Sequence, residues 1–263
     1  MILPTFAAVL LASSGSVLPE YLPLMREEVR LLQEEQEQQD VLDVEDAGGD
    51  PFPSTGSAEE TSDEFVTVRS GGTTYALGDV PVRAWFGPYV RDMVLRGIVT
   101  GYRDAQGTPT GVFGPERPVS VEELAKMAVA AAGIDASACP VPRNATAKGG
   151  WSASFVGCAE GKKFSIFSDA TVDVRRPALR GEVVVTTLEA FGVALPAATD
   201  SPFSDVLPSA QFASAILRAA ADGIVGGYKD AAGNATGTFA PDRQISRAEI
   251  AKVLSLAIQV YAE

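Results

Sequence analysis

Histidine is absent from the 263 residues, and cysteine occurs only twice, as Cys139 and Cys158. The absence of histidine removes the usual general base near neutral pH and the commonest metal ligand, which excludes catalytic triads built on histidine. Two cysteines cannot supply the four ligands of a closed zinc site, and we expect no cofactor. In an oxidising compartment the pair would form a disulfide worth about 3 kcal/mol; two buried free thiols are the alternative.

Basic residues are in the minority, since 21 Lys and Arg against 34 Asp and Glu give a net charge of −13. The excess of acid lies between Glu20 and Glu64, where 15 acids accompany two arginines, whereas the chain from residue 65 onward has 19 acids and 19 bases. A neutral body behind an acidic segment lacks the basic stripe that phosphate neutralisation requires. Nucleic acid is therefore excluded as a partner, and anionic membrane surfaces are disfavoured.

A long apolar run is also missing. Ile2–Ala12 is apolar and precedes small residues, as in a secretory signal, but no Lys or Arg comes before it, and a stray hydrophobic tail is the alternative. Such a run is too short to span a bilayer as a helix. We predict a signal-like leader at 1–19, an acidic helix at 20–46 that is a candidate docking site for a protein partner, and a disordered linker at 47–64.

An internal repeat organises the rest of the chain. Asp79–Lys126 aligns without a gap on Asp205–Lys252 at an offset of 126, with 21 of 48 pairs identical. A degraded copy lies between them, because Val172–Glu182 aligns with Phe239–Glu249 at an offset of 67. The repeat predicts three units, at 65–135, 136–195 and 196–263, each built as helix, glycine-rich loop and helix.

The predicted first helices run over 83–96, 151–162 and 209–221, with Gly97 and Gly223 as C-terminal caps. The second helices carry apolar stripes at helical spacing, which would close a common core. These stripes are Leu124, Met127, Ala128, Ala131 and Ala132; Val183, Thr186, Thr187, Ala190 and Phe191; and Ile250, Val253, Leu254, Ala257 and Ile258.

The order of motifs in each unit resembles the S-layer-homology family. Each full unit begins with Asp-Val and continues with Gly-Ile-x-x-Gly-Tyr-x-Asp and Thr-Gly-x-Phe-x-Pro. The first unit also has aromatic residues in its first helix, and the last unit has Ser-Arg-Ala-Glu at 246–249. The resemblance implies an all-α fold of three repeats forming a pseudo-threefold prism, with a degenerate middle repeat. It also implies grooves between repeats that bind secondary cell-wall polysaccharide, often pyruvylated. In the family an arginine contacts the acidic sugar, and the resemblance assigns this role to Arg247 in the last repeat and Arg180 in the middle repeat. In the first repeat Val121 occupies that place.

Each candidate site residue also has a structural interpretation. A guanidinium at a helix start suits an acidic glycan, but Ser246 with Glu249, and Ser120 with Glu123, also form the Ser-x-x-Glu capping box. Gly101 and Gly227 would admit a sugar close to the backbone or permit a positive φ. Tryptophans stack on sugars or fill cores. The candidate ligand-binding residues are Arg247, Arg180, Gly227, Gly101, Tyr228, Tyr102, Ser246, Ser120, Lys252, Lys126, Trp151 and Trp85.

The predicted function is non-enzymatic attachment of an exported protein to cell-wall polysaccharide at the cell surface. One alternative is a structural surface-layer component that self-assembles without binding sugar. The other is a wall-glycan hydrolase, which would need two carboxylates about 5 to 10 Å apart. No acid outside the capping boxes stands out from the repeat, and the single acid in each Gly-Tyr-x-Asp loop is too little for a calcium site.

Overall fold

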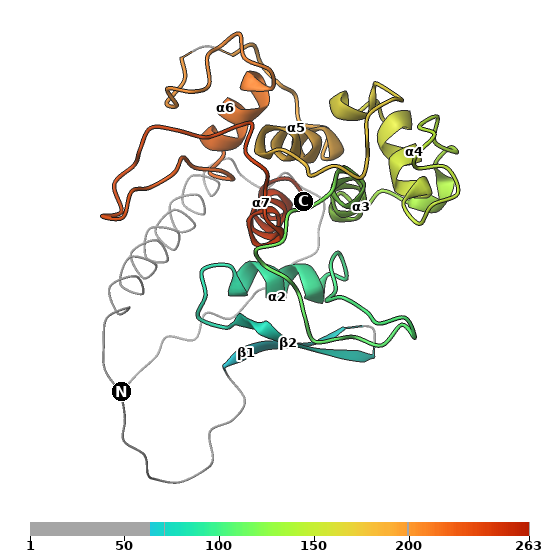
Figure 1. Ribbon diagram of the computed structural model, residues 1–263. Helices are drawn as coiled ribbons and strands as arrows, with labels where there is room; N and C mark the ends of the chain where they lie inside the picture. The colour runs from blue at the N-terminus through green and yellow to red at the C-terminus, as the bar shows by residue number, and fades with distance from the viewer. Residues whose placement is uncertain (1–63, 71, 199, 263) are drawn as a thin grey trace, which may run out of the picture. The chain divides into compact units, whose positions relative to one another are not determined.

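The computed structural model describes residues 64–70, 72–198 and 200–262 (Figure 1). The predicted leader, acidic helix and linker lie outside these residues, except for Glu64 at the end of the linker. Among the described residues, no helix has the length and apolar character needed to cross a membrane. The elements are strands β1 (Phe65–Ser70) and β2 (Thr73–Pro81), helices α2 (Gly87–Leu95), α3 (Val121–Ala131), α4 (Ala153–Gly161), α5 (Arg180–Ala190), α6 (Ala213–Ala221) and α7 (Arg247–Tyr261), and 3-10 turns η1 (Ala136–Ala138) and η2 (Ser165–Phe167).

The expectation of an all-α fold is wrong, because β1 and β2 form an antiparallel two-stranded sheet at the start of the first unit. Alternation explains the strands: Val66 and Val68 are buried on one face of β1, and Tyr75 and Leu77 on the same face of β2. That face packs against α2. A period of two with β-branched residues favours strand over helix, and this lead-in precedes the repeated segment that suggested helices.

The second helices of the three units, α3, α5 and α7, contact one another and lie side by side in Figure 1. Most of the predicted stripe residues are buried here, including Leu124, Val183 and Ile250 at 0 % exposure. Each first helix packs on the second helix of a different unit: α2 on α7, α4 on α3, and α6 on α5. The units are therefore linked in a ring of helix contacts rather than each closing on itself.

The first helices begin two to four residues later than predicted, because the preceding residues form turns. The predicted C-terminal caps are confirmed: Gly97 and Gly223 follow the helices with φ of 70° and 72°. In the middle unit Lys163 adopts the same left-handed conformation with φ of 63°, although it carries a side chain. The turn after α4 is therefore left-handed without the glycine that usually favours this conformation.

An acid at the start of each full unit fixes the loop that follows its first helix. The Asp79 carboxylate accepts hydrogen bonds from the backbone N–H groups of Phe113 and Gly114, at 2.8 and 2.7 Å. Asp205 accepts the equivalent pair from Phe239 and Ala240, at the same two distances. The repeated Asp-Val is therefore a structural staple, since a carboxylate accepting two N–H donors ties two distant segments together.

In its described residues, the middle unit lacks an aspartate that accepts hydrogen bonds from two backbone N–H groups, as Asp79 and Asp205 do. Asn144 takes the place of the acid and donates from Nδ2 to the carbonyl of Val172, at 2.8 Å. The predicted disulfide between Cys139 and Cys158 is present and joins the segment after η1 to α4. Both features compensate in this unit for the missing carboxylate staple.

Candidate functional site

The helix starts of the full units are capped as the sequence predicts. Ser120 Oγ accepts from Glu123 N while Glu123 Oε2 accepts from Ser120 N, and Ser246 with Glu249 repeats the pattern at α7. The capping interpretation of these four residues is confirmed. At the start of α5, the Leu179 side chain cannot accept a hydrogen bond, so half of the capping box is missing. The other half is present, because the Leu179 N–H donates to Glu182 Oε2 at 2.9 Å.

Arg180 reaches from the start of α5 into the loop of the third unit. Its Nη1 lies 3.4 Å from Glu249 Oε1, its Nη2 donates to the carbonyl of Gly226 at 3.1 Å, and its Nε has no partner among the described residues. The guanidinium lies 4.6 Å from the ring centroid of Phe239. Burial lowers the pKa of Arg180, against the opposing effects of Tyr228 and Glu249. An arginine remains charged even so, which makes this a buried cation with one unused donor.

Arg247 occupies the equivalent place at the start of α7 and reaches into the loop of the first unit. It is only 7 % exposed, and its Nε and Nη2 donate to the carbonyls of Phe113 and Thr100, at 2.9 and 3.4 Å. Its Nη1 lies 3.5 Å from Glu123 Oε1. Arg247 and Arg180 thus join neighbouring units through carbonyls and one carboxylate each. In the first unit Val121 holds this place and is fully buried.

Each of the two loop tyrosines, Tyr228 and Tyr102, lies near two arginines, one from its own unit and one from another unit. The guanidinium groups of Arg180 and Arg243 lie 5.2 and 5.0 Å from the ring centroid of Tyr228. Those of Arg247 and Arg117 lie 5.0 and 4.8 Å from that of Tyr102. Cations at this range are attracted to the electron-rich ring face.

Tyr228 itself is left with an unused hydroxyl. Burial raises the pKa of Tyr228, while Arg180 and Arg243 act in the opposite direction. The neutral phenol therefore persists, and its buried Oη makes no hydrogen bond to any described residue. A buried hydroxyl without a partner costs about 1–3 kcal/mol, so a ligand that bonded to it would recover that cost.

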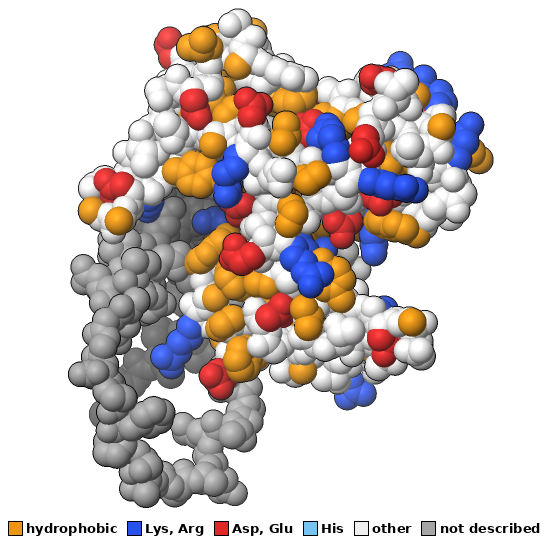
Figure 2. All heavy atoms as spheres, viewed as in Figure 1, with side chains coloured by type: hydrophobic (Ala, Val, Ile, Leu, Met, Phe, Trp, Pro, Cys, Tyr) orange, Lys and Arg blue, Asp and Glu red, His pale blue; other side chains and the backbone are white. Residues whose placement is uncertain are grey.

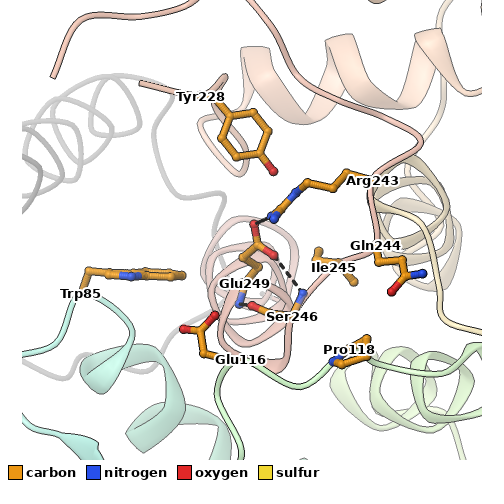
Figure 3. Close-up of a pocket in the computed structure, with 9 residues that line it drawn as sticks. All are labelled: Trp85, Glu116, Pro118, Tyr228, Arg243, Gln244, Ile245, Ser246 and Glu249. Carbon is orange, nitrogen blue, oxygen red and sulfur yellow. Dashed lines mark hydrogen bonds and ion pairs between the residues drawn. The ribbon is translucent and has the colours of Figure 1, made fainter. Parts of the chain in front are cut away.

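A pocket of about 640 Å³ lies beside this cluster, between the third unit and the first (Figure 3). Trp85, Glu116 and Pro118 line it from the first unit; Tyr228, Arg243, Gln244, Ile245, Ser246 and Glu249 line it from the third. Figure 3 shows Trp85 with the edge of its ring toward the Arg243–Glu249 ion pair, and Tyr228 with its hydroxyl toward Arg243. The volume and the two aromatic residues, Trp85 and Tyr228, suit a sugar ring or two.

Of the predicted site residues, Trp85, Tyr228 and Ser246 line the pocket. Lys252 lies at its edge, with Nζ 5.9 Å from the Trp85 ring. Arg180 and Arg247 are not among the lining residues, although Arg180 contacts two of them. Arg243 was missed, as was its counterpart Arg117. Both precede the Ser-x-x-Glu motif by three residues at the repeat offset of 126, so the repeat itself carried the signal.

Two other predicted pairs have places of their own. Trp151 and Lys126 lie together between α3 and the start of α4, with Nζ of Lys126 5.9 Å from the Trp151 ring.

Gly101 and Gly227 do not adopt positive φ, so the prediction that they serve to permit a positive φ is wrong. A Cβ at Gly101 would lie 2.9 Å from the carbonyl oxygen of Val112, and one at Gly227 would lie 2.8 Å from that of Thr238. Glycine is needed there because the returning strand of the loop packs directly on the backbone.

Chemically, the pocket offers an aromatic face, a guanidinium, an unused hydroxyl and two carboxylates. Glu249 is engaged by the backbone of its own helix and by two arginines, and Glu116 is the second carboxylate. Within the described ranges no group of His, Cys, Asp and Glu is arranged to hold a metal ion. This combination of an aromatic platform with fixed polar groups favours recognition of a sugar that carries an acidic substituent.

Comparison with known proteins agrees with this chemistry. Residues 202–251 match the S-layer homology domain, and this segment contributes α6, the start of α7 and every third-unit residue that lines the pocket. That domain is a cell-wall binding module rather than a catalytic one, and its presence indicates a protein associated with the cell surface or envelope. No curated protein matches the chain.

Proposed function

We propose that this protein is a non-catalytic anchor, which attaches to an acidic cell-wall polysaccharide through the pocket between its first and third units. The observation that carries the proposal is the pocket itself. It is built partly from the matched S-layer homology segment and places Trp85 opposite Arg243, beside the unused Tyr228 hydroxyl. A sugar ring would stack on Trp85 while its carboxylate would replace Glu249 as the partner of Arg243.

The three units at 65–135, 136–195 and 196–263 belong to the same proposal, with the middle one degenerate. In support, α2 and α6, and α3 and α7, begin at positions 126 residues apart. The Asp79 and Asp205 staples and the left-handed residues Gly97, Lys163 and Gly223 also recur. In the middle unit, Asn144 and the disulfide replace the staple.

A pyruvyl ketal is the acidic substituent that we propose for the ligand. It presents a single carboxylate on a sugar ring, which matches one exposed guanidinium fork beside one aromatic face. In this proposal Arg180 and Arg247 act from behind, by holding the tyrosines and capping glutamates in place. Tyr228 and Ser246 contact the ligand, and Lys252 and Trp85 flank it.

Export through the leader at 1–19, a protein partner at 20–46, and self-assembly into a surface layer complete the proposal. Self-assembly alone, without sugar binding, is the competing hypothesis. It predicts concentration-dependent sedimentation of the full chain that wall polymer does not alter.

Calorimetric titration of the full chain with purified wall polymer tests the proposal. We expect binding that falls at least about tenfold in affinity once pyruvate is removed from the polymer, because the charge-assisted bonds to Arg243 are lost. Arg243→Gln should reproduce that loss. Arg96→Gln is the matched control, since Arg96 is an exposed arginine in an ion pair with Asp92 on α2 at 2.8 Å.

Equal binding by Arg243→Gln and by the unaltered chain would refute the pocket assignment. Release of new reducing ends during the titration would show that the protein is a hydrolase instead.

A further inference from the structure

A second surface, at the junction of the first and middle units, carries counterparts of several pocket residues. We call it the α3 surface: Arg117, Ser120, Glu123, Lys126, Trp151 and Arg175. Trp151 and Lys126 repeat the contact of Trp85 and Lys252, with the same 5.9 Å separation. Isolated β-bridges join the units at the corresponding points, Pro118 to Ser246 beside the pocket and Ser120 to Pro177 at the α3 surface. The two places are therefore built on the same plan.

Their arginines differ in one respect. In the pocket, Arg243 pairs with Glu249. On the α3 surface, Arg117 lies over the ring of Tyr102, as Arg243 lies over Tyr228, but Glu123 pairs with Arg247 alone, whereas Glu249 pairs with both Arg180 and Arg243. Across the described part of the chain Arg117 has no carboxylate partner, so its positive charge is not neutralised.

A glycine explains how Arg117 is placed. A Cβ at Gly114 would lie 2.9 Å from Cδ of Arg117 and 3.0 Å from Cε2 of Tyr102. The arginine therefore packs where a methyl group would be. At the equivalent position in the third unit stands Ala240, and there Arg243 extends to Glu249.

The neighbouring charges differ in the same direction. Glu116, which lines the pocket, corresponds in the repeat to Arg175 on the α3 surface. Arg175 and Lys126 are exposed, and within the described residues neither forms an ion pair. Of the nearby acids, Glu122 accepts a hydrogen bond from Ser152 at 2.5 Å, Glu123 pairs with Arg247, and Asp173 accepts from the backbone N–H of Arg175 at 3.0 Å. Figure 2 shows both basic and acidic side chains over α4 and the segments around it.

We infer that the α3 surface binds a doubly charged substituent, a phosphate monoester on a wall sugar, whereas the pocket binds a singly charged carboxylate. The inference rests on the proposed function, because it assigns different ligands to two versions of one site. A phosphate carries about −1.5 to −2 charges at pH 7 and three acceptor oxygens, and Arg117, Lys126 and Arg175 give this surface three positive charges. Trp151, 57 % exposed, supplies the face for the sugar ring.

The two tryptophans allow each place to be observed separately, because the chain contains only two, Trp85 and Trp151. Trp85→Phe leaves Trp151 as the reporter of the α3 surface, and Trp151→Phe leaves Trp85 as the reporter of the pocket. Each full-length variant is titrated by fluorescence with glucose 6-phosphate and with glucose bearing a 4,6-pyruvyl ketal. The two probes share one sugar ring and differ in the anionic group.

We expect the Trp151 reporter to show about tenfold tighter binding of glucose 6-phosphate than of the pyruvylated sugar, because two further cations contact the dianion. The Trp85 reporter should not share this preference. Arg117→Gln should abolish the preference at Trp151, while Arg243→Gln should leave it intact. Thermal unfolding of each variant shows that the fold is retained.

Equal affinities at Trp151, or a preference there for the pyruvylated sugar, would overturn the inference and leave the proposed function standing. A phosphate preference at Trp151 that survives Arg117→Gln would overturn it as well. Absence of any response at Trp85 to the pyruvylated sugar would count against the proposed function, whatever Trp151 shows.

Discussion

Replacing Thr186 with valine should stabilise the protein. Thr186 lies in the middle of α5 at 0 % exposure, and its hydroxyl has no hydrogen-bond partner among the described residues. The equivalent positions in α3 and α7 are Met127 and Val253, both apolar and buried. Valine has nearly the shape of threonine, so the change removes a buried unpaired hydroxyl without opening a cavity.

The magnitude follows from the cost of burying that hydroxyl, which is about 1–3 kcal/mol in protein mutational data. We expect Thr186→Val to raise the free energy of unfolding by about 1–2 kcal/mol, measured by urea denaturation at constant m value. The adjacent Thr187 is the matched control, because it is equally buried but donates to the carbonyl of Val183 at 2.7 Å. Thr187→Val gives up about 1 kcal/mol of hydrogen bonding and gains a buried methyl of similar value, so it should change stability little.

If Thr186→Val instead destabilised the protein more than Thr187→Val, the reasoning would be refuted. That result would mean that the Thr186 hydroxyl has a partner in solution.

Two further predictions concern contacts within single units. The Tyr261 hydroxyl donates to Asp222, and burial together with that bond raises the pKa of Tyr261, so its stabilising contribution is complete below about pH 10 and is lost at higher pH. Tyr261→Phe should therefore lower the free energy of unfolding at pH 8 and weaken its fall between pH 10 and 11.5, and an unchanged alkaline profile would contradict this. The disulfide between Cys139 and Cys158 spans 19 residues, so Cys139→Ala with Cys158→Ala should cost about 3 kcal/mol, measured against the oxidised chain by the same denaturation. Equal stability of the two forms would show that Asn144 alone fixes the middle unit.

Much of the helical framework was accessible from the sequence because the repeat multiplied each local signal. One helix with an apolar stripe is ambiguous, whereas Ile250 and its counterparts at offsets of 126 and 67 predict the same buried face three times. The capping boxes were equally predictable, since Ser-x-x-Glu is a local sequence pattern that forms local hydrogen bonds. The sheet was missed because Phe65–Ser70 precedes the repeat, and only its own short alternation marked it.

The candidate site was less accessible, because the contacts that define it join distant parts of the chain. Arg247 suits a ligand at a helix start, yet its donors reach Phe113 and Thr100, more than 130 residues away, and nothing local in the sequence shows this. Arg243 lines the pocket and shares Glu249 with Arg180, which comes from another unit. Residue type identified the chemistry, but the packing of neighbouring units decided which arginine is exposed.

That packing also explains why the sites and the fold cannot be separated. Since α2 packs on α7, α4 on α3 and α6 on α5, every unit buries its first helix against a second helix from elsewhere in the chain. The pocket lies at one of these junctions, with Trp85 preceding α2 and Ser246 capping α7. The α3 surface lies at another, with Trp151 preceding α4 and Ser120 capping α3. At the third junction Gln211 and Leu179 stand where the tryptophan and serine would be, so the same architecture there lacks the aromatic face and the cap. The helix ring therefore supplies three equivalent positions, and only two of them carry the tryptophan and the capping serine on which our proposal depends.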